Sequence, residues 1–319
     1  MKLLHVVLFI LSSLWACAGN MSKVDGEEVH SSMSLTVVDE LGDPVTNAFA
    51  RITFIRLHSR GGNQEYERMT DSRGCCSASG WSDGGITVHL WKEGHYRSKV
   101  RFDPRTAEVV ESGWWRRTNY RLKRMIVLKR IAKPVETAYA FGLLKKIPVY
   151  GEWLGFDLEK RAWTPPYGLG IHEDVLLKFT QEIKDRQLDF RATMEVSFTN
   201  NPFAGVYAIP FDGDSELHGD YCAQTNAVYQ STLSYTFERH PGTAPGGNSL
   251  GHDKILVFRT RTKIDERGGL VDAHYGRIHG PWDFYGGMYL ETLHFNPIGN
   301  DVRIEDSETV RRSRRSISQ

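Results

Sequence analysis

Apolar and polar residues alternate along much of this chain, and the alternation predicts strands. The clearest case runs from Leu188 to Thr199, where every second residue is apolar. A period of two over this length is typical of a strand in an antiparallel sheet with one buried and one solvated face. The C-terminal half contains no long amphipathic helical pattern. The chain is therefore predicted to be all-β.

Shorter segments of the same kind fill the first part of the chain, with turn residues between them. Strands are expected at 34–39, 48–57, 64–70, 86–91, 96–102 and 121–129. Gly42-Asp43-Pro44 and Asp71-Ser72-Arg73-Gly74 mark turns. Short strands at this spacing predict an immunoglobulin- or transthyretin-like β-sandwich over residues 33–130 rather than a fold in which strands and helices alternate.

A second, mostly antiparallel β domain is expected over residues 131–310. Its strands are predicted near 175–179, 188–199, 233–237, 254–264, 270–279 and 288–295. Residues 265–269 join two of these strands as a hairpin with a five-residue loop. Prolines and the segment from Trp163 to Gly168 mark irregular crossings between the other strands.

Residues 1–18 have the pattern of an export signal. Lys2 precedes an apolar stretch from Leu3 to Trp15, and small residues follow it. A segment of this length is too short to remain as a membrane span. Export is therefore expected.

Two cleavage sites compete at the end of this signal. Cutting after Ala18 would release a secreted protein. The sequence Leu14-Trp15-Ala16-Cys17 instead resembles a bacterial lipobox, in which Cys17 becomes the lipidated first residue, although Trp15 is an unusual occupant of that motif. We expect lipidation at Cys17 and a polar tether over residues 19–32, with plain secretion as the alternative.

Composition and charge agree with a soluble body. Hydrophobic residues make up 40% of the chain and charged residues 25%. The 40 basic and 39 acidic side chains give a formal charge of +1, which argues against nucleic acid as the main partner. Four arginines stand in the tail at 311–319, so the tail is basic and the body mildly acidic. A solvated terminus is expected there, and contact with an anionic lipid or polymer is the alternative.

The first predicted sandwich also resembles a known family. Its landmarks occur in order, as Val38-Asp39, Gly42-Asp43-Pro44-Val45 with Ala48, Thr70-Asp71 with Gly74, and Gly94-His95-Tyr96. They are similar to the carboxypeptidase regulatory-like domain, a small transthyretin-like β-sandwich appended to many exported bacterial proteins. The departure is the pair Cys75-Cys76, where ordinary strand residues are usual. The resemblance implies an accessory or interaction role, since nothing in that domain is catalytic.

The C-terminal half resembles exported bacterial proteins of unknown function. The similarity rests on Gly155-Phe156-Asp157-Leu158, the stretch from Trp163 to Gly170, Tyr275-Gly276-Arg277-Ile278, and Phe295-Asn296-Pro297 with Asn300-Asp301. It transfers no function.

Export permits disulfides. Apart from Cys17 the chain contains Cys75, Cys76 and Cys222, so at least one thiol stays free unless chains pair with each other. A bridge from Cys75 or Cys76 to Cys222 would join the two domains and is one open possibility. The chain has no C-x-x-C, which leaves a thioredoxin-like redox site or a zinc knuckle without support.

The familiar catalytic motifs are incomplete. None of the 12 histidines has glutamate three residues later, so a zinc peptidase is excluded. The segment from Gly247 to Gly251 matches G-x-S-x-G around Ser249, but a nucleophile elbow needs a strand before the serine and a helix after it. We interpret the segment as a glycine-rich loop. Whether the protein is an enzyme stays open, with a non-catalytic role favoured.

Four carboxylates stand at alternate or near-alternate positions in one loop: Asp212, Asp214, Glu216 and Asp220. Calcium requires several oxygen ligands that converge from a short segment. Leu217 and Ala223 occupy the positions where an EF-hand needs glycine and glutamate. A solvated polar loop is expected and a calcium-stiffened loop is the alternative; no other cofactor is expected.

Aromatic residues in irregular segments offer a binding surface. The candidates for stacking on a sugar ring or a protein partner are Trp114, Trp115, Trp153, Trp163 and Tyr167. The competing interpretation is that these rings close the ends of the sandwiches.

These observations favour an exported, lipid-anchored, non-catalytic envelope protein that binds or scaffolds. Its expected partners are the membrane, through the anchor, and an envelope protein or polysaccharide, but no nucleic acid. The alternative is a carbohydrate-binding or carbohydrate-acting protein that uses exposed Trp and Tyr surfaces. An open cleft lined by two carboxylates at glycosidase spacing would favour the acting form of that alternative.

Overall fold

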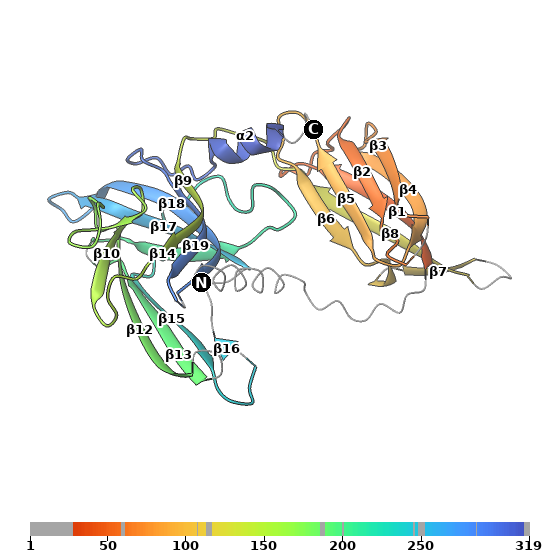
Figure 1. The fold of residues 1–319 in the computed structure, drawn as a ribbon. Coiled ribbons are helices and arrows are strands. Elements are labelled where there is room, and N and C mark those ends of the chain that lie inside the picture. The colour runs from red at the N-terminus through yellow and green to blue at the C-terminus, as the bar shows by residue number, and fades with distance from the viewer. Residues whose placement is uncertain are drawn as a thin grey trace. The chain divides into compact units, whose positions relative to one another are not determined.

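The structure of this chain is a computed structural model, in which the described residues are 28–58, 61–106, 108–112, 117–185, 189–199, 201–244, 246–247, 253–284 and 286–315. Its regular structure is almost entirely β-strand, in four sheets (Figure 1). The all-β prediction is confirmed. The chain divides into two compact units: unit 1 comprises Met1–Arg130 and Gly213–Glu216, and unit 2 comprises Ile131–Asp212 and Leu217–Gln319.

Unit 1 is a sandwich of two four-stranded sheets. The first has the order β4-β1-β8-β7, with strands β1 (Val29–Val38), β4 (Cys75–Ser82), β7 (Glu108–Ser112) and β8 (Arg117–Val127). The second has the order β3-β2-β5-β6, with strands β2 (Phe49–Phe54), β3 (Gln64–Met69), β5 (Ile86–Trp91) and β6 (Ser98–Phe102). A short 3-10 helix, η1 (Pro104–Thr106), follows β6. Strands β1 and β8 are parallel, and the other neighbours in these two sheets are antiparallel.

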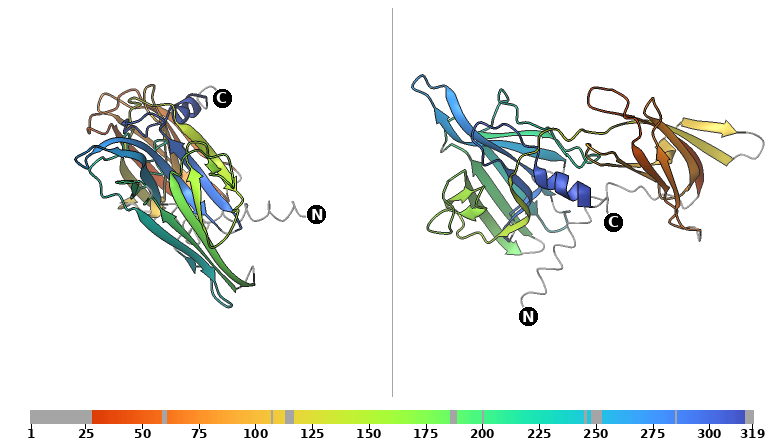
Figure 2. Two further views of the ribbon diagram at one scale, coloured as in Figure 1. Left: turned by 90° about the vertical axis from the view of Figure 1, so that its left-hand side faces the viewer. Right: turned by 90° about the horizontal axis from the view of Figure 1, so that it is seen from above.

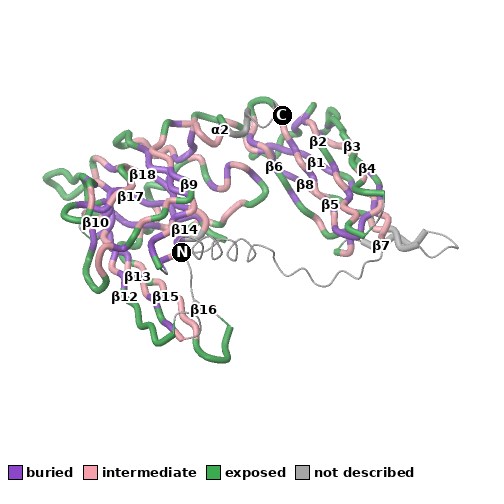
Figure 3. Tube along the Cα trace, in the orientation of Figure 1, coloured by how far each residue is buried: buried purple, intermediate pink, exposed green. Residues whose placement is uncertain are grey.

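One core lies between the two sheets of unit 1, and alternation along the strands builds it. In β5, Ile86, Val88 and Leu90 are fully buried while the residues between them are only partly buried. Core side chains from both sheets form a single cluster that includes Met33, Leu35, Val37, Ala50, Ile52, Phe54, Leu122 and Ile126. Figure 3 shows the buried segments gathered in the strands and the exposed ones in the turns.

Aspartates close the two turns that the sequence predicts. The Asp39 carboxylate accepts hydrogen bonds from the N–H groups of Leu41 (3.0 Å) and Asp43 (2.9 Å). Asp71 accepts in the same way from Arg73 and Cys75. These bonds satisfy backbone donors that the sheet ladders leave unpaired.

Unit 2 also contains two sheets. The six-stranded sheet has the order β11-β10-β12-β13-β15-β16, with strands β10 (Trp153–Asp157), β11 (Ala162–Trp163), β12 (Val175–Asp185), β13 (Asp189–Ser197), β15 (Thr232–Arg239) and β16 (Gly246–Gly247). The five-stranded sheet has the order β14-β17-β18-β19-β9, with strands β9 (Ala138–Lys145), β14 (Gly205–Pro210), β17 (Lys254–Ile264), β18 (Leu270–Asp283) and β19 (Met288–Phe295). Figure 2 shows these strands from two further sides.

Both sheets of unit 2 contribute to one core. Phe190, Ala192, Met194 and Val196 of β13 are buried, as their alternation predicts. Ala192, Met194 and Val196 are part of one cluster. That cluster also contains Leu177 and Phe179 of β12 and residues of β17, β18 and β19. The five-residue hairpin loop is confirmed as well: Asp265 N–H donates to the Gly269 carbonyl at 2.8 Å. Several strands have no alternating signal in the sequence and were not predicted, namely β4, β7, β9, β10, β11, β14 and β16.

The far face of the five-stranded sheet carries a buried polar cluster. The Arg277 guanidinium contacts the Asp306 carboxylate at 2.8 Å, and His294 Nδ1 lies 3.3 Å from the same carboxylate. Asp306 is also the N-cap of helix α2 (Ser307–Arg315), since it accepts a hydrogen bond from Thr309 N–H at 2.7 Å. One buried carboxylate thus joins the sheet to the helix.

Helix α2 includes part of the basic tail. Residues 311–315 continue the helix, and Arg311 pairs with Glu136 at 3.0 Å. Within the described part of the chain, none of the helices has the length and apolar character of a membrane span.

A second, half-buried imidazole lies beside this cluster. The His279 ring centroid lies 5.2 Å from that of His218 and 6.1 Å from that of His294. Burial, together with the nearby positive charge of Arg277 and the two neighbouring imidazoles, lowers the pKa of His279 to about 2. His279 is therefore neutral in the folded protein at neutral pH and resists protonation below the ordinary histidine pKa of 6.5.

This shift predicts acid destabilisation of unit 2. Below the ordinary histidine pKa of 6.5, the unfolded chain binds a proton at His279 and the folded chain does not. The contribution of His279 to the free energy of unfolding should therefore fall by about 1.4 kcal/mol for each pH unit below 6.5. Urea unfolding of the wild type and of H279Q, at about pH 7 and about pH 5, measures it.

H279Q should lose less stability on acidification than the wild type. H172Q, which changes an exposed histidine of the same unit, should lose as much stability on acidification as the wild type. Equal pH dependence of H279Q and the wild type would show that His279 is not held neutral.

Candidate functional site

A dense network of charged side chains surrounds Arg261 in unit 2. Arg261 lies at an irregular point of β17, where the register with β18 shifts and its backbone adopts a φ of 49°. Bulges of this kind redirect a side chain away from the regular alternation of a strand. The side chain of Arg261 accordingly reaches the carboxylates of Asp157, Glu159 and Asp174.

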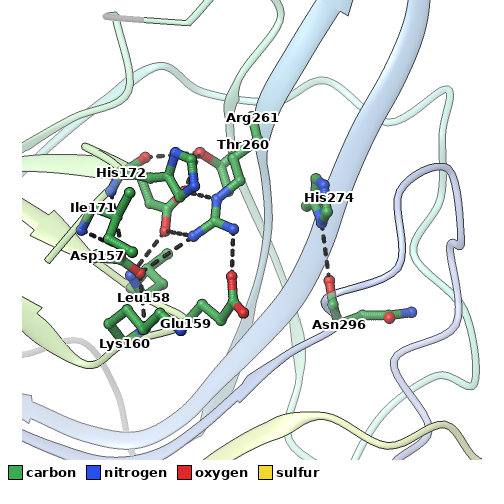
Figure 4. A network of polar contacts seen from close by, with 11 residues as sticks. Asp157, Leu158, Glu159, Lys160, Ile171, His172, Thr260, Arg261, His274 and Asn296 are labelled. Carbon is green, nitrogen blue, oxygen red and sulfur yellow. Dashed lines mark hydrogen bonds and ion pairs between the residues drawn. The ribbon is translucent and has the colours of Figure 1, made fainter.

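The contacts of this guanidinium are charge-assisted and almost fully enclosed. Nε and Nη2 donate to the two oxygens of Asp174 at 2.8 and 3.0 Å, and Nη2 also lies 3.2 Å from Asp157. Nη1 donates to Glu159 (Figure 4). The side chains of Asp157 and Asp174 have no exposed surface. We call Arg261, Asp157, Glu159 and Asp174 the Arg261 network.

The two buried carboxylates also hold the loop between β10 and β12. Asp157 accepts hydrogen bonds from the N–H groups of Lys160, Ile171 and His172, all within 2.9 Å (Figure 4). Asp174 accepts one from Leu158 N–H at 2.9 Å. Both ends of the loop are thereby fixed to the strand that carries Arg261.

The same loop packs against Gly155 of β10. Thr164 N–H donates to the Gly155 carbonyl at 2.9 Å, and a Cβ on Gly155 would lie 2.4 Å from Thr164 Oγ1. Only glycine fits at this approach. The segments 155–158 and 163–170, which stand apart in the sequence, are therefore one structural feature.

The pKa values of the two aspartates are pushed in opposite directions. Burial favours the neutral form of Asp157, but the three backbone N–H donors and Arg261 outweigh it and lower its pKa. Around Asp174 burial dominates and raises the pKa in spite of Arg261. Such a split is typical of acid–base pairs. Here, however, each oxygen of the two carboxylates already accepts from Arg261 or from a backbone N–H group of the loop. We therefore assign both residues to holding the loop.

The predicted aromatic residues separate into buried and exposed ones. Trp163 is only 6% exposed, its Nε1 donates to the Lys146 carbonyl at 2.9 Å, and its ring packs on Phe156 and Phe179. It is a core residue, so the stacking surface predicted for it is not formed. Trp153 is 47% exposed and Tyr167 44%. Trp114 and Trp115 lie outside the described residues.

Trp153 stands on the outer face of the six-stranded sheet, because its neighbour Leu154 points into the core. The strand register places Lys178 of β12, Glu195 of β13 and Ser234 of β15 in line with it. Lys178 Nζ lies 5.8 Å from the centroid of the Trp153 ring and 3.4 Å from Glu195.

A second line of side chains runs beside the first. Thr180, Thr193 and Thr236 are opposite one another on β12, β13 and β15, and the hydroxyls of Thr193 and Thr236 are 3.2 Å apart. We call the two lines together the Trp153 face; its members are Trp153, Lys178, Thr180, Thr193, Glu195, Ser234 and Thr236. Alternation in β13 could have indicated this outer face from the sequence, but the register across strands could not be read there.

The loop for which calcium was the alternative to a solvated polar loop does not gather its carboxylates. Asp214 and Glu216 extend the edge of unit 1, where the Asp214 carbonyl accepts from Lys99 N–H at 2.8 Å and Glu216 N–H donates to the Arg97 carbonyl at 2.9 Å. Asp212 and Asp220 belong to unit 2. Among the residues that the structure describes, no three His, Cys, Asp or Glu side chains are placed to hold a metal ion. Two of the four carboxylates thus belong to one compact unit and two to the other.

The cysteines form no disulfide in the described part of the chain. Cys75 and Cys76 are partly buried free thiols on β4, and Cys222 is an exposed free thiol. The predicted bridge from this pair to Cys222 is therefore not made. Burial raises the pKa of Cys76 to about 11, which keeps it a thiol at neutral pH. Cys17 and Ser249 lie outside the described residues.

Loss of Arg261 should destabilise unit 2. The variant R261M leaves Asp157 and Asp174 buried without a positive partner, and breaking a buried pair in this way costs about 3–5 kcal/mol. Denaturant unfolding followed by circular dichroism measures the loss.

The double variant R261M/D174N should recover part of the lost stability, because one buried charge is removed. R267Q, in the exposed hairpin loop, is the matched control and should change little. A loss for R261M no larger than that of the control would contradict this role.

Comparison with known proteins gives no family. No family model and no curated protein matches this chain. Partial likenesses are found to 3-chlorocatechol 1,2-dioxygenase from Rhodococcus opacus 1CP (11% identity, TM-score 0.27, 34% of this chain and 62% of that chain) and to catechol 1,2-dioxygenase from Acinetobacter sp. ADP1 (13%, 0.27, 35% and 56%). The dioxygenase domain of a dioxygenase carbohydrate-binding protein fusion from Streptomyces sp. SirexAA-E is similar at 14% identity (TM-score 0.25, 33% and 84%). This chain spans less than two thirds of the first two proteins, and likenesses this low assign no activity.

Proposed function

We propose that this chain is an exported, non-catalytic binding module of the cell envelope, with the Trp153 face as its ligand surface. The observation that carries the proposal is the 47% exposure of Trp153 on an outer sheet face beside Lys178 and Glu195. A large exposed aromatic side chain flanked by polar groups is typical of a recognition surface. The polar groups of the Arg261 network, by contrast, are bonded to one another and to the loop that they hold.

Two sequence features support the envelope location and the accessory role in this proposal. The leader predicts a lipid on Cys17, and the resemblance of the first domain to the carboxypeptidase regulatory-like domain implies an accessory role. The sandwich architecture of unit 1 and its Asp39 and Asp71 turns support that resemblance without distinguishing it from other β-sandwiches.

A carbohydrate is the ligand class that the Trp153 face favours. An indole ring can stack on the apolar face of a sugar, while an ammonium, a carboxylate and a hydroxyl group bond to the sugar hydroxyls. A carbohydrate-acting role receives no such support from Asp157 and Asp174, because a glycosidase needs two carboxylates that flank the scissile bond. We therefore favour binding over hydrolysis.

The proposal predicts that Trp153 dominates binding. Truncation of an aromatic residue at the centre of a recognition surface costs about 2 kcal/mol or more, equivalent to about thirtyfold in Kd. The mature protein, applied to an array of immobilised neutral and charged oligosaccharides, should bind at least one of them, and W153A should lose that binding.

The matched control is F141A, which truncates a residue of β9 that is 63% exposed on the other sheet of unit 2. F141A should bind like the wild type. Binding that survives W153A, or that F141A abolishes equally, would place the ligand surface elsewhere.

The lipid anchor has its own test. Mass spectrometry of the mature N-terminus should find a diacylated Cys17, and C17S should move the protein from the membrane fraction to the soluble fraction. A mature chain that begins with a free Gly19 would contradict the anchor and favour plain secretion.

A further inference from the structure

The two charges within the Trp153 face compensate each other, since Lys178 lies 3.4 Å from Glu195. One line beyond the threonines the register places Glu182, Arg191 and Glu238, and Arg191 lies 3.6 Å from Glu238, which leaves one carboxylate in excess on that line. Between these two ion pairs the second line of the Trp153 face consists of threonines only. The surface therefore presents many hydrogen-bonding groups and little net charge.

The Trp153 face is elongated across the strands. Its first line runs from Trp153 through Lys178 and Glu195 to Ser234, one residue on each of four neighbouring strands. Strands are spaced about 4.8 Å apart, so this line is about 14 Å long. Trp153 occupies one end and the exposed Ser234 the other. A ligand that contacts the whole line must itself be extended and run perpendicular to the strands.

Compensated charges discriminate by ligand charge. A sugar hydroxyl both donates and accepts, so a single hydroxyl can accept from Lys178 and donate to Glu195 without a change of net charge. The carboxylate of an acidic sugar would be repelled by Glu195, and the ammonium of an amino sugar would be repelled by Lys178. Each such contact costs free energy unless the internal pair opens.

We infer that the Trp153 face binds an extended, uncharged polysaccharide laid across β10, β12, β13 and β15, with Trp153 stacked on one sugar and Ser234 bonded to another. This inference rests on the proposed function and names the class of carbohydrate. Lys178 and Glu195 are its charge-selecting residues.

The test is calorimetric titration of the mature protein at neutral pH. The probes are cellohexaose, xylohexaose and mannohexaose as uncharged chains, and hexagalacturonate and N,N,N-trimethylchitosan hexamer, whose quaternary ammonium groups stay charged at neutral pH, as charged ones. At least one uncharged chain should bind, with Kd lower than that of either charged chain by about tenfold or more.

Two variants examine the selecting residues. E195Q removes the charge that compensates Lys178, so it should bind hexagalacturonate more tightly than the wild type does, by about tenfold. S234A should weaken binding of the uncharged chain by a few-fold, because the far end of the line is lost. E266Q, in the exposed hairpin loop, is the matched control and should change neither affinity.

The outcomes separate the inference from the function on which it rests. No binding to any probe would remove the proposed carbohydrate ligand. Tighter binding of a charged chain, with dependence on Trp153, would leave carbohydrate recognition in place and overturn its selectivity for uncharged chains. Binding of an uncharged chain that S234A leaves unchanged would overturn its placement across the strands, and an unchanged affinity of E195Q for hexagalacturonate would overturn the charge-selecting role of Glu195.

Discussion

A single guanidinium determines how the loop after β10 can fold. Asp157 and Asp174 are fully buried, and two carboxylates at such a site would be costly without a positive partner. Arg261 supplies that partner from the opposite sheet, on a bulge that turns it out of the alternation of β17. With Arg261 in place, the carboxylates can accept the N–H groups of the loop and hold it in one conformation.

The same principle recurs at the other face of the five-stranded sheet. Asp306 compensates Arg277 and caps α2, so a buried ion pair again connects an irregular segment to regular structure. Buried pairs add little net stability compared with apolar packing, because desolvation offsets the attraction. They do fix one arrangement, since any other would leave a charge alone. In unit 2 these buried ion pairs lie where a strand is followed by a loop or a helix.

The loop held by the Arg261 network separates two tryptophans that look alike in the sequence. Trp163 lies within it and is carried into the core, where its ring contacts Phe156 and Phe179. Trp153 precedes it on β10 and stays on the outer face, next to Lys178. The exposed ring therefore belongs to a sheet surface with fixed register, and this rigidity would lower the entropy cost of binding the extended ligand that we propose.

Local periodicity in the sequence determined the all-β fold, several strands and the turns closed by Asp39 and Asp71, because these depend on neighbours within a few residues. It missed β4, whose small and polar residues carry no apolar alternation, and it grouped carboxylates between 212 and 220 that belong to different compact units. The Arg261 network depended on tertiary structure alone, and so did the set of neighbours around Trp153, although the sequence names Trp153 itself as a candidate. Asp174 and Arg261 are 87 residues apart, and strand register, which no local pattern encodes, decides which side chains stand beside Trp153.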